Sequence, residues 1–448
     1  MATISGFPYA ELQFTKDAVI FDNNELAELN KMITDGSLSD LIVISHGWNN
    51  DMDDARSLYR SLVDKIARAQ ASTPDGKKFG ILGILWPSKK FADKDLIAGG
   101  GAASAVSPVE KDKVALKNQL DALDGFFDGE ASDAIIARAR KLVDSMRTDK
   151  AAAGMFVREM NRLFKEGVKP VENEAEEDVI HSFGETSPDS LLARLQDEDI
   201  DLPNAKSMQG ASDIGPIGSM STQGMGAAAG TGFSLGNIFG AAKNLLNFVT
   251  YYQMKERAGK VGLTGLHPVL VKMKNDFPNL KLHMIGHSFG GRLVTAAVNG
   301  NPGATFQVDS LILLQAAFSH FGFAKQYDGS NDGFFRSVIT AHKVKGVIFI
   351  TFTHNDTAVG IAYAIASRIA RQVGSFLGDK DDRFGGLGGN GAVDTPEAIN
   401  DFHLVQDGTY TFKKGNLYNV NGDACIMGHS DICKDEVGRA IIAAVDAS

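Results

Sequence analysis

Apolar residues in this chain fall into short continuous runs separated by stretches with helical spacing. The runs SDLIVISHGWNN (39–50) and KKFGILGILWP (77–87) each hold an apolar block bounded by turn residues, which predicts buried strands. Between them, DDARSLYRSLVDKIARAQ (53–70) has the spacing of an amphipathic helix. Strand, helix and strand in succession are typical of βαβ units. The pattern therefore predicts an α/β fold with a mostly parallel central sheet flanked by helices.

The same alternation returns in the second half of the chain. LKLHMIG (280–286), VDSLILLQAAF (308–318) and VKGVIFITFTHNDTAVG (344–360) predict three more strands, and IAYAIASRIARQV (361–373) predicts a helix. Weaker patterns at the two ends of the chain predict further strands. They are the opening segments YAELQFTKD (9–17) and AVIFD (18–22), and a hairpin in YTFKKGNLYNV (410–420) that turns at Lys414-Gly415.

The alternation is interrupted between Pro87 and the strand at 280–286. A simple crossover needs only a few dozen residues, whereas this connection has almost two hundred. We therefore expect an α/β core at 1–89 and 256–448 and a large, mainly helical insertion at 90–255, which could form a cap or lid. Within the insertion, 207–232 is rich in Gly, Ser, Ala and Met, a composition typical of a mobile connector.

An apolar stripe follows this connector. Its members recur at helical spacing and are Leu235, Ile238, Phe239, Ala242, Leu246 and Val249. One interpretation is that the stripe packs on the α/β core. The other is that 233–249 belongs to a lid that makes interfacial contact with a lipid-like substrate. An apolar face by itself does not distinguish the two.

The segment LHMIGHSFGGRLV (282–294) contains the main candidate for chemistry. An apolar strand stops at Gly286-His287-Ser288-Phe289-Gly290, and helical spacing begins at once. Glycine at 286 and 290 removes side chains that would collide across a tight strand-to-helix turn. Ser288 would then stand exposed at the end of the strand, beside the positive end of a helix. The alternative is an ordinary serine N-cap.

A serine nucleophile needs a histidine base and a carboxylate that fixes the tautomer of that base. In the order serine, acid, histidine, Asp356 follows a predicted strand and His429 lies before the last helix. His403 is the rival base, and His354 is a candidate loop hydrogen-bonder. His46 and His287 are expected to shape turns. The rival acids are Asp382, Asp394 and Asp423.

The oxyanion formed in ester hydrolysis needs preorganised backbone N–H donors. One donor would be Phe289, directly after the nucleophile. The second would come from the loop His46-Gly47-Trp48 after an early strand, where Gly47 lets the backbone turn towards Ser288 and the N–H of Trp48 becomes the donor. The alternative is a glycine turn with a half-buried tryptophan.

Together, VISHGWNNDMDDAR, GILWPS, IGHSFGGRLV, THND and MGHSDI resemble a little-characterised bacterial branch of serine esterases in the α/β-hydrolase superfamily. The resemblance covers roughly 39–90 and 262–447. It implies the α/β-hydrolase fold, a triad of Ser288, Asp356 and His429, and an oxyanion hole completed near Trp48. It implies nothing about the long insertion.

Charge and hydropathy limit the classes of partner that this protein is expected to bind. The net charge of −10 argues against binding to nucleic acid, and no apolar run is long enough to cross a bilayer. The first residues are too polar for a signal peptide, so we expect a cytoplasmic protein. Cys425 and Cys433 bracket His429 and are expected to be free thiols; a disulfide and a zinc site are the alternatives.

The residues therefore predict a serine hydrolase that cleaves carboxylic esters of small-molecule or lipid-like substrates without a metal or organic cofactor. A thioesterase or amidase would use the same triad. Two further alternatives are a lipase or phospholipase with an interfacial lid, and a non-catalytic binding module on a hydrolase scaffold. Neither the natural substrate nor the oligomeric state follows from the residues.

Overall fold

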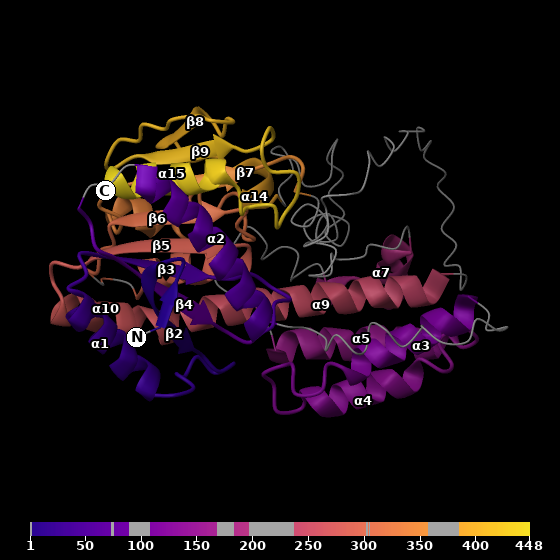
Figure 1. Ribbon diagram of the computed structural model, residues 1–448. Helices are drawn as coiled ribbons and strands as arrows, with labels where there is room; N and C mark the ends of the chain where they lie inside the picture. The colour runs from indigo at the N-terminus through magenta and orange to yellow at the C-terminus, as the bar shows by residue number, and fades with distance from the viewer. Residues whose placement is uncertain are drawn as a thin grey trace. The chain divides into compact units, whose positions relative to one another are not determined.

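The computed structural model describes residues 2–72, 76–88, 108–167, 183–196, 237–301, 303, 305–356 and 385–448. They form two compact units. The first takes in the described residues within 1–90 and 250–448, and the second those within 91–167 and 181–249. Figure 1 labels the helices and strands of both units.

A nine-stranded, mostly parallel sheet organises the first unit. Its order is β1-β2-β4-β3-β5-β6-β7-β9-β8, and within it only β1 and β2 pair antiparallel. The predicted α/β fold is confirmed at this level. The strands are β1 (Ala2–Ile4), β2 (Phe7–Gln13), β3 (Asp40–Ser45), β4 (Phe79–Leu85), β5 (Lys281–His287), β6 (Ser310–Leu314), β7 (Ile348–Phe352), β8 (Ala398–His403) and β9 (Leu417–Asn421).

The central strands are buried on both faces, which explains their continuous apolar runs. Every residue of β3, β4 and β6 is buried, so neither face of these strands needs a polar alternation. β3 lies between β4 and β5, so the strands on either side of the long insertion are near neighbours, as expected.

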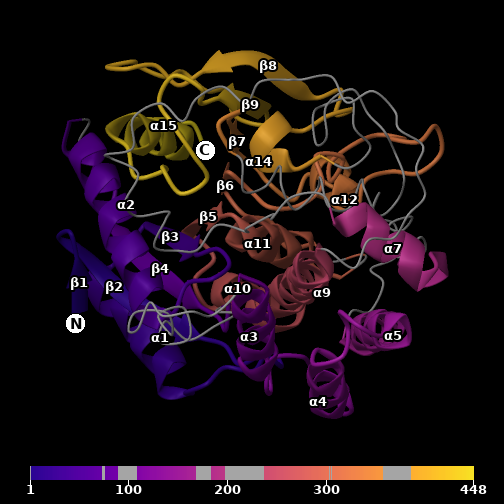
Figure 2. The same cartoon turned by 90° about the vertical axis from the view of Figure 1, so that its right-hand side faces the viewer.

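Helices cover both faces of the sheet (Figure 2). On one face lie α2 (Met52–Ser72) and α15 (Asp435–Asp446), which pack on the sheet through residues such as Tyr59 and Ile441. On the other lie α10 (His267–Asp276) and α11 (Phe289–Asn299). Other helical elements among the described residues of this unit are α1 (Asn24–Gly36), the π-helix η3 (Val261–Leu266), α12 (Arg336–Thr340) and α14 (Leu387–Asn390).

The second unit contains helices and turns, and no strand, among its described residues. It contains α3 (Pro108–Asp121), α4 (Ser132–Leu142), α5 (Lys150–Gly167), α7 (Pro188–Leu195) and the first half of α9 (Ile238–Lys260); the second half of α9 belongs to the first unit. Its aromatic core includes Phe164, whose ring lies 5.0 Å from that of Phe183 and 5.5 Å from that of Phe248. The described members of the predicted apolar stripe, from Ile238 to Val249, are all buried.

Two predicted elements are wrong. AVIFD (18–22) makes only an isolated bridge, between Ile20 and Phe14. The segment 410–420 is not a hairpin, although Gly415 does turn with a φ of 81°. Instead β9 pairs in parallel with both β7 and β8. The sequence prediction lacked β8, whose residues 398–403 are polar and have no clear apolar alternation.

Two other predicted segments lie outside the described residues: the helix at 361–373 and the connector at 207–232. Within the described ranges, no helix combines the length and the apolar character needed to cross a membrane.

Candidate active site

Ser288 lies in a sharp turn between β5 and α11. Its φ of 57° and ψ of −127° place it in a region that residues with a side chain rarely adopt. Three backbone hydrogen bonds hold it there. Its N–H donates to the Leu314 carbonyl at 3.1 Å, and its own carbonyl accepts from Gly291 at 2.9 Å and from Ala317 at 3.0 Å. The turn is thus fastened to the neighbouring strand β6.

Glycine is required on both sides of this turn. A Cβ at Gly286 would lie 2.4 Å from the Gly290 carbonyl oxygen, and a Cβ at Gly290 would lie 2.2 Å from the Ser45 carbonyl oxygen. Gly47 is equally constrained, since its Cβ would lie 2.5 Å from the Cβ of Ser288. The glycines therefore permit close backbone approach, which is the role predicted from their spacing.

A continuous hydrogen-bonded chain joins Ser288, His429 and Asp356. His429 Nε2 lies 2.8 Å from Ser288 Oγ, and His429 Nδ1 lies 2.8 Å from Asp356 Oδ2. Because a carboxylate only accepts, Nδ1 carries the proton and Nε2 is left to accept from the serine hydroxyl. The three residues come from loops or turns after β5, β7 and β9, whose carboxyl ends meet at one edge of the sheet.

The expectation that Ser288 stands exposed is wrong. The residue is 5% exposed, because Gly47 packs against it and His429 lies on its hydroxyl. The side chains of His429 and Asp356 are also buried, at 8% and 0% exposed. Electrostatic interactions among the three therefore operate largely away from bulk water, where they are stronger.

The rival residues lie elsewhere. His403 ends the edge strand β8, is exposed, and has Asp401 as an acidic neighbour at 3.8 Å. Asp423 pairs with His354 at 2.8 Å rather than with His429. Asp394 sits in a turn with a φ of 49°, and Asp382 lies outside the described residues.

The loop after β3 is held by its own side chains. His46 Nδ1–H donates to the Gly47 carbonyl at 2.9 Å, and the His46 ring stacks on Trp86 at 5.5 Å. Asn50, which the sequence interpretation did not single out, donates its side-chain amide to the carbonyls of Gly47 at 3.2 Å and Trp48 at 3.1 Å. The Gly47 carbonyl and the Trp48 N–H share one peptide plane, so Asn50 fixes the direction of that N–H.

Aromatic rings surround the two predicted oxyanion donors. The ring of Trp48 lies 5.9 Å from that of Phe289 and 6.1 Å from that of Tyr251, and Phe289 lies 5.0 Å from Tyr251. Trp48 is half-buried, and Phe289 is buried at the first position of α11. N–H groups in the first turn of a helix have no partner within the helix, which suits Phe289 to binding an anion.

His287 holds the loop that carries His429. Its Nε2–H donates to the His429 carbonyl at 2.9 Å, and the two rings lie 4.9 Å apart. Burial, with a smaller contribution from His429, lowers the pKa of His287 to about 3. Burial likewise lowers the pKa of His46 to about 4. Both rings are therefore neutral near pH 7 and act as fixed donors.

These two buried histidines predict a loss of stability in mild acid. Between pH 6.5 and 4 the unfolded chain binds a proton at each histidine that the folded chain does not. The free energy of unfolding should therefore fall by about 1.4 kcal/mol per pH unit for each of them as the pH drops. Urea unfolding at several pH values should show a shallower fall for His287→Asn than for the native protein.

His403→Asn is the matched control, because His403 is exposed, and it should leave that slope unchanged. Equal slopes for the native protein and His287→Asn would contradict the neutral, buried state of His287.

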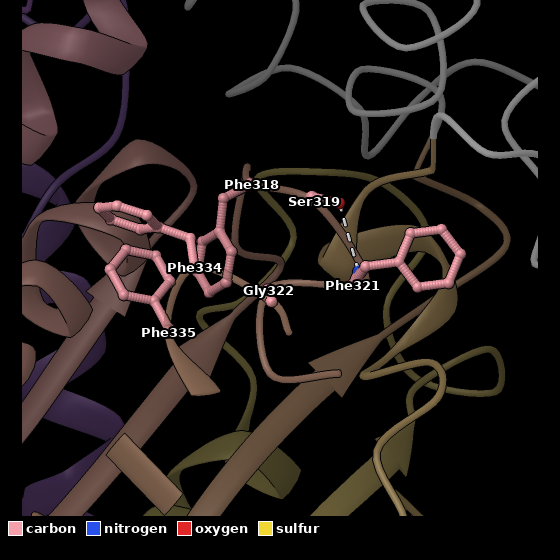
Figure 3. Close-up of a pocket in the computed structure, with 7 residues that line it drawn as sticks. Phe318, Ser319, Phe321, Gly322, Phe334 and Phe335 are labelled. Atoms are coloured by element: carbon pink, nitrogen blue, oxygen red, sulfur yellow. Dashed lines mark hydrogen bonds between the residues drawn. The ribbon is translucent and has the colours of Figure 1, made fainter. Parts of the chain in front are cut away.

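An aromatic cluster lies in the segments that follow β6, the strand next to β5. Figure 3 shows Phe318 beside Phe334 and Phe335, with the ring of Phe321 pointing away from them. These phenylalanines and the adjacent backbone line a small pocket of about 10 Å³, which has room for about one water molecule. Arg292, one turn after Ser288, lies 5.7 Å from the Phe334 ring and 5.8 Å from the Phe335 ring. The cluster thus packs against α11 through Arg292, one helical turn after Ser288.

No group of three or more His, Cys, Asp or Glu side chains among the described residues is arranged to hold a metal ion. Cys425 and Cys433 are free thiols, so the alternative disulfide is not formed. Burial raises the pKa of the Cys433 thiol to about 11, which makes it a weak nucleophile near neutral pH.

In comparisons with protein-family models, with curated proteins and with solved structures, nothing matches this chain.

Proposed function

We propose that this protein is a serine hydrolase with an α/β-hydrolase fold that cleaves carboxylic esters through an acyl-enzyme. The observation that carries the proposal is the chain of two 2.8 Å hydrogen bonds from Asp356 through His429 to Ser288. The positive φ of Ser288 after β5 and the place of Trp48 after β3 also support it, because nucleophile and oxyanion donor occupy these places in α/β-hydrolases.

In the first half-reaction, Ser288 Oγ attacks the ester carbonyl carbon and its proton passes to His429 Nε2. Asp356 accepts a hydrogen bond from His429 Nδ1–H and stabilises the imidazolium that forms. The negative charge that develops on the carbonyl oxygen is stabilised by the N–H groups of Phe289 and Trp48. The tetrahedral intermediate then collapses, the carbon–oxygen bond to the alcohol breaks, and His429 returns the proton to that alcohol.

In the second half-reaction, water attacks the acyl carbon and passes a proton to His429. Collapse of this second intermediate releases the carboxylic acid and returns the proton to Ser288 Oγ. The neutral form of His429 starts both halves, and every proton transfer in this mechanism uses Ser288, His429, the alcohol or water. Esters are preferred over amides in this proposal because they are the easier substrates for the same groups.

A fluorophosphonate probe tests the proposal directly. The probe should modify the native protein at Ser288, with loss of fluoride, and abolish hydrolysis of p-nitrophenyl acetate in proportion to labelling. A panel of p-nitrophenyl esters from acetate to palmitate then reports the acyl-chain preference. Absence of both labelling and hydrolysis would leave a non-catalytic binding module as the better account.

We further propose that the residues of the second unit form a cap that influences substrate choice. Its helical content and its place in the chain, between β4 and β5, support this proposal. The described members of the apolar stripe, from Ile238 to Val249, are buried, so contact with lipid would first require these side chains to become exposed. A lipase with an interfacial lid would reveal itself by a rate that rises when the substrate passes its solubility limit.

Limited proteolysis tests the cap. The composition of 207–232 predicts that the earliest cleavage falls there, and the nicked enzyme should change its acyl-chain preference more than its rate on the acetate ester. Cleavage products are located by mass spectrometry, and the ester panel is repeated on the nicked protein. An unaltered preference would make the segment a passive connector.

A further inference from the structure

The two partners of Ser288 are carried by separate loops. Asp356 lies in the loop after β7, and His429 lies in the loop after β9. The two strands pair in parallel, with Phe352 opposite Asn421, so the loops leave the sheet side by side (Figure 1). The single hydrogen bond between His429 and Asp356 cannot by itself fix two loop backbones. Other contacts must set the distance between them.

Asp423 accepts hydrogen bonds from the loop that carries Asp356. It lies near the start of the loop that leads to His429. Its Oδ1 accepts from Thr353 Oγ1 at 2.9 Å and from the His354 N–H at 2.8 Å. Its Oδ2 accepts from His354 Nδ1 at 2.8 Å and from Asn421 Nδ2 at 3.1 Å. Partial burial opposes ionisation, but these hydrogen bonds outweigh it and lower the pKa of Asp423 to about 2. The carboxylate is therefore charged at neutral pH.

Asn355 makes the reciprocal contact. It directly precedes Asp356, and its side-chain amide donates to the carbonyls of Asp423 at 3.1 Å and Ile426 at 2.9 Å. One amide group thus donates to two carbonyls of the opposite loop, six and three residues before His429. The two loops hold each other from both sides.

We propose that Asp423 and Asn355 form a clamp that sets the distance between Asp356 and His429. Both are positioning residues, since the hydrogen bonds of Asp423 and Asn355 go to the two loops and not to Ser288 or the His429 ring. The inference rests on the proposed hydrolase function and extends it. A displacement of about 1 Å in a catalytic group can slow an enzyme on the order of 100-fold, so a clamp of this kind has a measurable effect on turnover.

The first test is Asp423→Ala, compared with the exposed Asp401→Ala as a matched control. Asp423→Ala should lower kcat on p-nitrophenyl acetate on the order of 10- to 100-fold and leave KM within about twofold, because the clamp acts on the catalytic groups. Asp423→Asn keeps one oxygen for Thr353 and the His354 N–H and should recover part of the loss. Asp401→Ala should leave kcat unchanged.

A double-mutant cycle separates positioning from general stability. In an Asp356→Asn background the contact that the clamp sets is already impaired, so adding Asp423→Ala should lower the fluorophosphonate labelling rate by less than about threefold. The fall in melting temperature caused by Asp423→Ala should be the same in both backgrounds. If Asp423→Ala does not fold, Asn355→Ala carries the same expectations.

Full retention of the Asp423→Ala effect in the Asp356→Asn background would overturn the clamp, as would native kcat in both Asp423→Ala and Asn355→Ala. Failure of the native protein itself to label or to hydrolyse esters would overturn the proposed function instead. The two failures are therefore distinguishable.

Discussion

Ser288→Ala is expected to abolish ester hydrolysis, with kcat falling by a factor on the order of 10⁴ or more. Alanine keeps the Cβ but removes the Oγ that lies 2.8 Å from His429 Nε2, so no covalent acyl intermediate can form. The three backbone hydrogen bonds of the turn do not involve the hydroxyl. The fold and melting temperature should therefore change little. Steady-state kinetics with p-nitrophenyl acetate and circular dichroism are the measurements.

Ser319→Ala is the matched control. Ser319 has the same exposed fraction as Ser288, 5%, and its hydroxyl accepts a hydrogen bond from the Phe321 N–H in the loop after β6. Loss of that hydroxyl should leave fluorophosphonate labelling intact. Undiminished turnover in purified Ser288→Ala would remove the whole mechanism.

His429→Ala is expected to be as damaging as the serine substitution. In the proposed mechanism the imidazole accepts the proton from Ser288, and among the described residues it alone is hydrogen-bonded to both Ser288 and Asp356. Residues that act as one catalytic unit lose activity non-additively, so Ser288→Ala combined with His429→Ala should be little worse than either change alone. Kinetics of the two single variants and the double variant measure this.

His403→Ala is the comparison for the histidine. His403 is exposed at the end of the edge strand β8, so its loss should be mild. The reverse ranking of His429→Ala and His403→Ala would transfer the role of base to His403 and would mean that the loops rearrange in the active protein.

The strands of the sheet could be predicted where burial on both faces produces a continuous apolar run in the sequence. β3 and β4 are buried on both faces, so their residues are apolar at nearly every position and the strands stand out in the chain. The sharp turn that carries Ser288 could also be predicted from the sequence. Glycines at 286 and 290 are spaced as a strand-to-helix turn requires, and the carbonyl oxygens of Gly290 and Ser45 do occupy the space that side chains there would fill.

Edge and turn elements were less predictable. β8 has a polar sequence with exposed positions because it lies at the edge of the sheet, so it has no apolar pattern that would predict a strand. When β8 is not predicted, the sequence around Gly415 suggests a hairpin. In the structure β9 lies between β7 and β8 and is parallel to both. Which strands pair is decided by contacts between distant segments, and local spacing does not contain that information.

For the candidate site, the order of residues along the chain favours Ser288, Asp356 and His429, but it leaves His403 as a second histidine and Asp382, Asp394 and Asp423 as further acids in the same order. Only the tertiary structure decided that Ser288 is buried, that Asp423 pairs with His354, and that Asn50 and Asn355 hold the backbone of the active loops. Those contacts join residues from different loops. Their partners are chosen by the packing of the whole sheet, since hydrogen bonds of this kind depend on distance and angle in space rather than on separation along the chain.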